Sequence, residues 1–243
     1  MPTPPALTVV VPAHDESELL PSCLRAIRIS VERAGVRAET VVVANRCHDD
    51  TAELAERAGA RLVVDDHRNL SAVRNAGIDA ARGRAVVTVD ADCRMHPRTI
   101  RTALGFLAGG AHVGGAVKVR PERRSPGIDA SYAVVELLTA VTGLGGGVFW
   151  AGRRDLHAIG GFDESLLVGE DLDLARRLRR HGRRTGRRFA ILTGCPLVAS
   201  CRKFDRYGDW HMFALARELP AIRAAANGTD TAWVDEYFFD FNG

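Results

Sequence analysis

The sequence predicts an α/β fold with a mostly parallel central sheet flanked by helices. Short apolar runs rich in β-branched residues alternate with longer segments of helical periodicity over residues 1–120. These runs are apolar at nearly every position, which is typical of strands buried on both faces. A chain that alternates strands and helices in this way forms right-handed crossovers between parallel strands, and this is the basis of the fold prediction.

The expected strands are the apolar runs, each of which is bounded by polar or turn-forming residues. Valine dominates the first two, and its branched side chain favours a pleated backbone. In chain order, the expected strands are ALTVVVPA (6–13), ETVVVAN (39–45), ARLVVDD (60–66), RAVVTVD (84–90) and AHVGGAVKV (111–119).

The expected helices lie between these strands and have apolar residues at a spacing of three to four. The first three end at Gly35, Gly59 and Gly83, because glycine readily takes the backbone angles that terminate a helix. Acidic residues open the second helix, where they complement the helix dipole. In chain order, the expected helices span 16–35, 49–59, 69–83 and 96–110.

Composition excludes several classes of protein. The chain has 243 residues, of which 46% are apolar and 26% charged, as in ordinary globular proteins and unlike fibres or disordered tails. A net charge of +3 is too small for a dedicated nucleic-acid binder, so no nucleic-acid partner is expected. No internal repeat or low-complexity linker divides the chain, and we therefore expect a single domain.

Cysteine usage and the termini favour a cytoplasmic location. The five cysteines are scattered and include no C-x-x-C pair, so neither a disulfide framework nor structural zinc is expected. The N-terminus lacks the charged and apolar regions of a signal peptide. The most apolar long window, 132–150, contains Glu136 and four glycines, so no transmembrane segment is expected. A peripheral position at a membrane interface stays open.

Polar and acidic residues follow three of the expected strands. In an open α/β sheet, ligands bind at the carboxyl ends of the strands, so these residues are candidates for a site. Neither a G-x-G-x-x-G nor a G-x-x-x-x-G-K-[ST] motif is present, which argues against dinucleotide and P-loop phosphate binding. The residues are Ala13 to Glu16 after the first strand, Asn45 to Asp50 after the second, and Asp90 and Asp92 after the fourth.

Asp90 and Asp92 raise the question of what balances their charge. Residues two apart at a strand end point the same way, so their carboxylates repel each other. Carboxylates are the ligands that hard divalent cations prefer, and we expect Mg²⁺ or Mn²⁺ here, holding a diphosphate. The alternative is that the pair only caps the helix that follows Pro97.

Four segments of the chain together carry a family resemblance. In chain order they are VVVPAHDE, VVVANRCHDDTAELA, NLSAVRNAGIDAARGRAVVTVDAD and GGFDESLLVGEDLDLARRLRRHG. Their order and spacing resemble those of family 2 glycosyltransferases with the GT-A fold, and the resemblance covers roughly residues 7–205. It implies a Rossmann-like, mostly parallel sheet with a nucleotide-sugar-binding half (1–120), and a smaller acceptor-side half with a C-terminal tail (121–243).

The resemblance assigns roles to residues of the donor site. In the family, a DxD motif binds the metal and the donor diphosphate, an acid after the first strand contacts the nucleoside, and an arginine faces the nucleotide. Asn45 stands where the family often has an aspartate that reads the base of a uridine nucleotide. A UDP-sugar is favoured, while thymine and guanine donors stay open. The expected donor-binding residues are Ala13, Glu16, Asn45, Arg74, Asp90 and Ala91, with Asp90 and Asp92 as metal ligands.

The family's ED motif is Glu170-Asp171, and it implies a general base for the acceptor hydroxyl. Asp171 is the expected base and Glu170 its rival, because adjacent helical residues point about 100° apart and only one should face the donor. The alternative is that these acids, together with Asp173, only complement a helix dipole. His211 is a candidate third metal ligand, as in some relatives, although a lone histidine is usually structural.

The resemblance implies a metal-dependent glycosyltransferase that inverts the donor's anomeric configuration in a single displacement, acting on a small-molecule or lipid-linked acceptor. Two alternatives are a sugar-phosphate nucleotidyltransferase, which would need a Gly-rich basic loop where this chain has PAHDESE, and a non-catalytic nucleotide-sugar-binding protein. The sequence does not decide whether the chain forms a homodimer.

The basic run 176–188 is either a solvated helix face or a binding surface for an anionic acceptor or lipid head groups. The tail 230–242 mixes acidic and aromatic residues, which could pack against a sugar, against the core of the domain or against a dimer partner.

Overall fold

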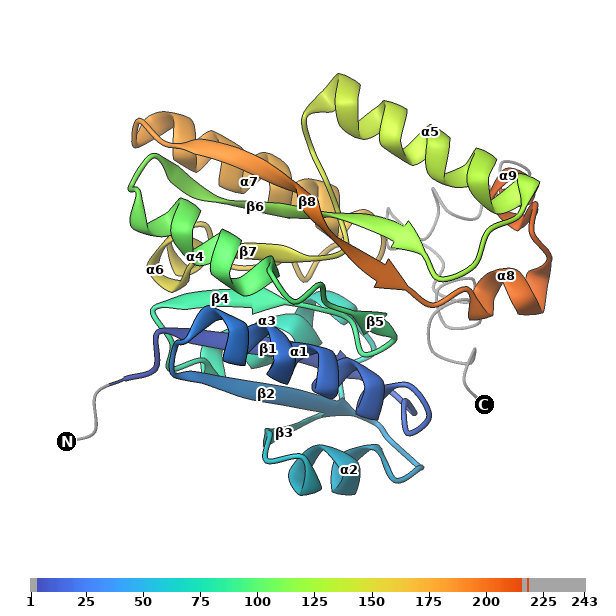
Figure 1. The fold of residues 1–243 in the computed structure, drawn as a ribbon, viewed down its shortest axis with the longest axis horizontal. Coiled ribbons are helices and arrows are strands. Elements are labelled where there is room, and N and C mark those ends of the chain that lie inside the picture. The colour runs from blue at the N-terminus through green and yellow to red at the C-terminus, as the bar shows by residue number, and fades with distance from the viewer. Residues whose placement is uncertain (1–3, 216–217, 219–243) are drawn as a thin grey trace.

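An eight-stranded sheet forms the centre of the computed structural model, which describes residues 4–215 and 218 (Figure 1). The strand order across the sheet is β3-β2-β1-β4-β7-β6-β8-β5. The strands are β1 (Leu7–Ala13), β2 (Ala38–Asn45), β3 (Arg61–Asp65), β4 (Ala85–Thr88), β5 (Cys93–Arg94), β6 (His112–Pro121), β7 (Phe149–Gly152) and β8 (Arg188–Ala199). The helices are α1 (Leu20–Ala34), α2 (Thr51–Arg57), α3 (Leu70–Ala80), α4 (Thr99–Ala108), α5 (Pro126–Thr142), α6 (Arg153–Ala158), α7 (Glu170–Arg184), α8 (Arg202–Tyr207) and α9 (His211–Ala214). The predicted tail 230–242 lies outside the described residues.

The first four predicted strands form one parallel block, β3-β2-β1-β4, as expected. Successive valines of β1 face opposite sides of the sheet, as the period of two requires. Val9 and Val11 pack in the core under α1 and α4, whereas Val10 packs in the core under α3, α6 and α7. Helices therefore cover both faces, and the α/β prediction with a mostly parallel sheet is confirmed.

The second half of the sheet departs from a simple alternation of strand and helix. The fifth predicted strand, β6, does not lie beside β4, because β7 is inserted between them and runs antiparallel to both. Strand β8 then pairs in parallel with β6. The tight fit of β6 against its neighbours requires glycine, since a Cβ on Gly115 would lie 1.7 Å from the carbonyl oxygen of Ala190.

Helix α3 ends before the predicted Gly83. Its last helical residue is Ala80, and residues 81–84 form an extended connection to β4. Gly83 crosses directly over β1, where its N–H donates to the Thr8 hydroxyl at 2.8 Å and a Cβ would lie 2.4 Å from the backbone of β1. The glycine is needed for this close approach and not for helix termination.

The two-residue strand β5 lies at the edge of the sheet, although it follows β4 directly in the chain. It pairs antiparallel with the end of β8, and the Ser200 N–H donates to the Asp92 carbonyl at 3.2 Å. The carboxyl end of β8 is thereby held next to the turn that follows β4. Within the described residues, no helix is both long enough and apolar enough to cross a membrane.

Candidate functional site

A pocket of about 300 Å³ lies at the carboxyl ends of β1, β2 and β4. This is where an open α/β sheet binds ligands. All the residues expected to bind the donor or to act as base line it, so the fold brings together side chains from positions 13 to 171. The lining residues are Pro12, Ala13, His14, Glu16, Asn45, Leu70, Val73, Arg74, Asp90, Ala91, Asp92, Glu170, Asp171, Arg202 and Lys203.

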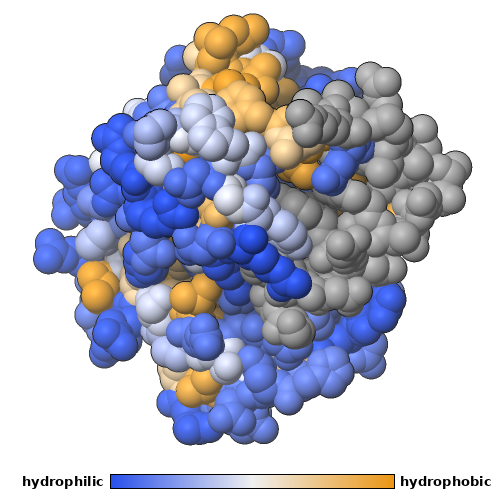
Figure 2. Space-filling model, turned by 90° about the vertical axis from the view of Figure 1, so that its right-hand side faces the viewer, coloured by the Kyte–Doolittle hydropathy of each residue, from blue (hydrophilic) through white to orange (hydrophobic). Residues whose placement is uncertain are grey.

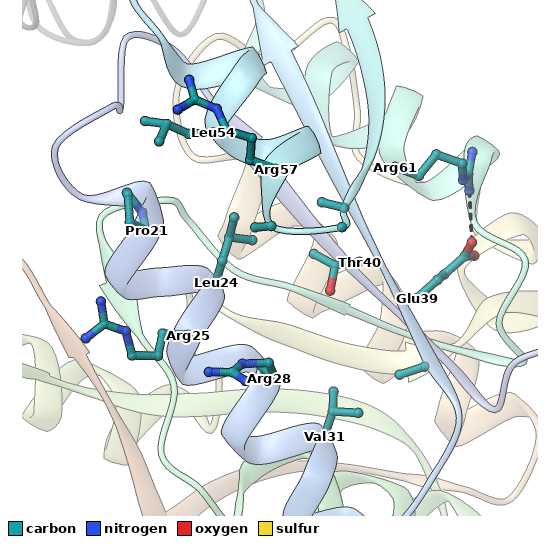
Figure 3. Close-up of a pocket in the computed structure, with 14 residues that line it drawn as sticks. Pro21, Leu24, Arg25, Arg28, Val31, Glu39, Thr40, Leu54, Arg57 and Arg61 are labelled. Carbon is teal, nitrogen blue, oxygen red and sulfur yellow. Dashed lines mark hydrogen bonds and ion pairs between the residues drawn. The ribbon is translucent and has the colours of Figure 1, made fainter.

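A second hollow, of about 760 Å³, lies between α1, α2 and the start of β2 (Figure 3). Arg25, Arg28 and Arg57 line it, and Arg61 pairs there with Glu39 at 3.3 Å. It is located at the amino ends of β2 and β3 and is not lined by the motif residues. The smaller pocket at the carboxyl ends is therefore the candidate site.

Arg74 is the centre of the site. Only 3% of its side chain is exposed, and its guanidinium contacts three carboxylates from two separate segments of the chain. Nη2 lies 3.0 Å from Asp90 Oδ1, while Nη1 lies 2.8 Å from Glu170 Oε1 and 3.2 Å from Asp171 Oδ1. We refer to these four residues as the Arg74 cluster. A buried arginine with three acidic partners fixes their geometry and offsets their repulsion.

Asp171 is held at both carboxylate oxygens. Oδ1 accepts from Arg74 and Oδ2 accepts from the Gly147 N–H at 2.7 Å. Gly147 has a φ of 87°, which favours glycine, and it follows Gly145 and Gly146 in the connection between α5 and β7. Burial raises the pKa of Asp171 to about 6, although Arg74 acts in the opposite direction.

Glu170 and Asp171 both line the pocket, which contradicts the expectation that only one of them faces the site. Both are in the first turn of α7, whose N-cap is Gly169 with a φ of 82°, and neither caps the helix. Because the amino end of α7 points at the pocket, adjacent first-turn side chains both reach Arg74. A helix dipole alone therefore does not account for these acids.

Arg202 and Lys203 line the pocket beside Asp92, and the sequence did not predict a role for either residue. The Arg202 guanidinium forms a two-contact ion pair with Glu16 and lies 3.6 Å from Asp92 Oδ2. We refer to Arg202, Glu16 and Asp92 as the Arg202 cluster. Burial raises the pKa of Glu16 to about 7 and lowers the pKa of Lys203 to about 8.

Asp90 and Asp92 fit a divalent cation. They do not cap the helix after Pro97, because the N-cap of α4 is Arg98 and no side chain bonds to it. Both carboxylates instead face the pocket from one turn, and burial together with the charge of Asp90 raises the pKa of Asp92. Among the lining residues, five carboxylates face three basic side chains, which leaves two negative charges when all are ionised. Hard oxygen ligands in a site of this charge suit Mg²⁺ or Mn²⁺.

Asn45 ends β2 at the rim of the pocket and is 2% exposed. Its amide nitrogen donates to the carbonyls of Asp65 and His67, at 2.9 Å each, and to Asp65 Oδ1 at 3.2 Å. These contacts occupy the nitrogen, so the group that Asn45 can offer to a ligand is its carbonyl oxygen, which accepts hydrogen bonds.

His211 is not among the residues that line the pocket. It lies at the start of α9, where its Nδ1 is 3.2 Å from the Gly208 carbonyl oxygen and its ring packs edge-on against Phe204. The structure therefore does not bring the predicted third metal ligand to Asp90 and Asp92. A cluster that the sequence did not predict, Asp15 with Cys47 and Asp49, instead holds the loops after β1 and β2 together.

The family model described as "Glycosyltransferase like family 2" matches residues 4–190 of the chain. An uncharacterised glycosyltransferase of Mycobacterium tuberculosis is 39% identical over 106 residues, which is 44% of this chain and 45% of that protein. An undecaprenyl-phosphate 4-deoxy-4-formamido-L-arabinose transferase of Pseudomonas savastanoi is 27% identical over 119 residues, or 46% of this chain and 35% of the relative. The matches to these curated relatives thus span less than half of their length.

Solved GT-A structures are similar across almost the whole chain. A mannosyltransferase from Pyrobaculum calidifontis in complex with GDP-Man and Mn²⁺ has a TM-score of 0.64, with 20% identity over 96% of this chain and 72% of that one. Glucosyl-3-phosphoglycerate synthase from Mycobacterium tuberculosis, in complex with Mn²⁺, UDP and phosphoglyceric acid, has a TM-score of 0.61, with 21% identity over 94% and 80%. At these identities the likeness establishes the fold.

Proposed function

Because the chain belongs to glycosyltransferase family 2, we propose that it transfers a sugar from a metal-bound nucleotide diphosphate to an acceptor hydroxyl. The observation that carries the proposal is the Arg74 cluster, in which one buried arginine connects the DxD motif to the ED motif. A donor bound by the first motif would thus lie next to the base supplied by the second. Proximity of this kind is a large part of what catalysis of a transfer between two substrates requires.

The charge of the pocket supports the use of a metal. A diphosphate entering a pocket with five carboxylates and three basic side chains needs additional positive charge. Asp90 and Asp92 would hold Mn²⁺ or Mg²⁺, and the bound ion would neutralise the diphosphate leaving group. Arg202 and Lys203, on the Asp92 side of the pocket, would contact the same diphosphate.

Asp171 is the proposed general base. Its raised pKa, about 6, allows it to stay ionised near neutral pH and still accept a proton from the acceptor hydroxyl. The bonds from Arg74 and Gly147 hold the carboxylate in position. Attack from the side opposite the diphosphate would invert the anomeric configuration in one displacement. Glu170 is the alternative base, since it also lines the pocket.

The donor base and the acceptor are proposed at the level of chemical class. The Asn45 carbonyl oxygen suits a base with a ring N–H donor, as in uracil, thymine and guanine, and does not suit the acceptor N3 of cytosine. We favour a UDP-sugar, although the solved neighbours bind GDP as well as UDP donors. The acceptor is a hydroxyl of a small molecule or of a lipid-linked compound, and the undecaprenyl-phosphate transferase among the relatives supports the lipid-linked class.

A thermal-shift screen of UDP, GDP, dTDP and CDP, each with and without Mn²⁺, tests this function. We expect Mn²⁺-dependent stabilisation that EDTA abolishes, of about 2.7 kcal/mol at a ligand concentration about 100 times the dissociation constant. Asp92→Ala should remove most of the effect, whereas Asp66→Ala, an exposed carboxylate outside the pocket, should leave it intact. Equal, metal-independent stabilisation of the Asp92 variant would contradict the proposal. Transfer assays with the full set of nucleotide sugars then distinguish an enzyme from a binding protein.

A further inference from the structure

Helix α5 has an apolar face that the rest of the described chain leaves uncovered. Val134, Leu138 and Val141 are four and three residues apart, so they lie on one side of the helix. They are 45%, 57% and 77% exposed, and Val135 and Leu137 beside them are 47% and 64% exposed. We refer to these five residues as the α5 apolar face. Hydrophobic side chains gather at the top of Figure 2, at the end of the molecule where Figure 1 places α5.

Among the described residues, the contacts that bury α5 are concentrated at its amino end. Ile128 is fully buried with Cys201 and Phe204 in a small satellite core. Two turns before Val134 on the same side of the helix, a Cβ on Gly127 would lie 3.0 Å from the Trp210 ring. From Ala133 onward almost every residue is exposed. Monomeric proteins rarely expose a contiguous group of large aliphatic side chains of this kind, and such groups mark interaction surfaces.

Helix α7 contributes a basic face next to the carboxyl end of α5. Arg176, Arg179 and Arg183 follow a spacing of three and four, opposite the buried Leu174 and Leu178. Arg179 Nη1 donates to the Thr142 carbonyl at 2.6 Å, which joins this α7 basic face to the last turn of α5. Within the described part of the chain, Arg176 and Arg183 are exposed and have no acidic partner. Both helices lie along the top edge of Figure 1.

We propose that the α5 apolar face and the α7 basic face together dock on the surface of a bilayer containing anionic phospholipids. Aliphatic side chains on one helix enter the headgroup region, while adjacent arginines attract the lipid phosphates, a combination that peripheral proteins require for stable binding. The carboxylate of Glu136 does not oppose this attraction, because it pairs with Lys118 at 2.8 Å.

The charge of the α7 basic face favours a bilayer over a second copy of the chain. A symmetric dimer brings the same patch of both subunits together, so the arginines of one α7 would approach those of the other. An anionic lipid surface instead presents the opposite charge across the whole contact. The inference does not depend on the proposed donor chemistry, because docking needs neither nucleotide nor metal.

Sedimentation of the full chain with vesicles tests the proposal. We expect binding to phosphatidylcholine vesicles that contain about one third phosphatidylglycerol, weaker binding to pure phosphatidylcholine, and release by added salt. Arg176→Gln with Arg183→Gln should lower the partition coefficient about 25-fold, at about five-fold for each arginine. Leu137→Ser with Val141→Ser should lower it at least about ten-fold, because two exposed aliphatic side chains are lost.

Matched variants elsewhere on the surface serve as controls. Val64→Ser removes a valine that is 70% exposed on β3, and Arg25→Gln with Arg57→Gln removes two exposed arginines near α2. These variants should bind vesicles like the parent chain. If the parent chain stays in the supernatant with both kinds of vesicle, or if the control variants lower binding as much as the α5 and α7 pairs, the proposal is wrong. The first result would favour a second copy of the chain as the partner of the α5 apolar face.

Discussion

The two arginine clusters of the pocket differ in burial and in origin. Arg74 is 3% exposed and has three carboxylate partners within 3.2 Å, whereas the Arg202 side chain is 28% exposed and pairs with two carboxylates among the described residues. Arg74 comes from α3 in the interior, while Arg202 is the first residue of the short helix α8. We infer from this difference that the Arg74 cluster would hold the proposed catalytic acids in position, whereas the Arg202 cluster would contact the ligand.

The largest effect is expected from Asp171→Asn, in the Arg74 cluster. The amide keeps the shape of the side chain but cannot accept the proton of the acceptor hydroxyl, so turnover should fall by about 10²–10⁴-fold. Stabilisation by the nucleotide with Mn²⁺ should be unchanged, because Asp171 is proposed to act on the acceptor. Initial rates at saturating donor, together with thermal shifts, measure the two effects separately.

Glu170→Gln is the internal control for this prediction, because Glu170 contacts the same Nη1 atom of Arg74. It should be the milder variant. A larger loss of turnover in Glu170→Gln would assign the base to Glu170, and a product with retained configuration would exclude the single displacement.

Removing each arginine sharpens the comparison of the clusters. Arg74→Met should lower the free energy of unfolding at pH 7 by about 3–5 kcal/mol, because it leaves three partly buried carboxylates without their arginine. Arg202→Met should cost about 1–2 kcal/mol, since Arg202 is more exposed than Arg74 and Glu16 takes up a proton readily. The deficit of Arg74→Met should shrink from pH 7 to pH 5, as the acids become protonated. Urea unfolding at both pH values measures this, and equal losses in the two variants would contradict the distinction.

The pH dependence should also separate the clusters. Turnover should fall below about pH 6, because a base with a raised pKa loses its charge as the pH drops through that value. Diphosphate binding should weaken above about pH 8, where Lys203 becomes neutral. Lys203→Gln should abolish the alkaline change in nucleotide affinity and leave the acid limb of turnover in place. An alkaline limb that persists in this variant would assign it to another group.

The smallest effect is expected at Asn45, at the edge of both clusters. Asn45→Ala removes one hydrogen-bond acceptor for the base, so binding of UDP, dTDP and GDP should weaken by about 0.5–1.5 kcal/mol. CDP, whose N3 cannot donate, should be little affected. Isothermal titration with the four nucleotides checks this ranking, and an equal loss for all four would make Asn45 a structural residue that only joins β2 to β3.

The fold of the first half could be predicted because each of its strands is an uninterrupted apolar run. Strand β8 could not be predicted in the same way. It follows a basic helix, and its sequence RFAILTGCPLVA is interrupted by Gly194 and Pro196. The insertion of β7 between β4 and β6 is a tertiary pairing that no local pattern encodes, since β7 has only four residues.

The residues of the candidate site likewise divide into those that the sequence could predict and those that it could not. Glu16, Asn45, Asp90 and Asp92 were predictable because they follow clear strands or belong to a motif. Arg202 and Lys203 were not predictable, because they follow β8, which the sequence did not indicate, and are the first two residues of the six-residue helix α8. The expectation that only one of Glu170 and Asp171 faces the pocket assumed that the side of α7 lies along the pocket. The amino end of α7 points at the pocket instead, so both first-turn side chains reach it. His211 was predicted from the resemblance to relatives with a histidine ligand, without a local pattern to place it, and its ring packs against Phe204.

The ion pair between Glu16 and Arg202 has a consequence for how the molecule folds. The two residues are 186 positions apart in the chain. Closing so long a loop costs conformational entropy, so we expect this contact to form late, together with the other long-range contacts that offset this cost. Contacts of this separation slow folding, and a nascent chain folds its amino-terminal part first. We therefore expect the strands of the parallel block β3-β2-β1-β4 to pair before the pocket that they support is formed. A nucleotide that needs Arg202 and Lys203 cannot stabilise that early intermediate, so ligand binding should slow unfolding of the finished chain without speeding its initial collapse.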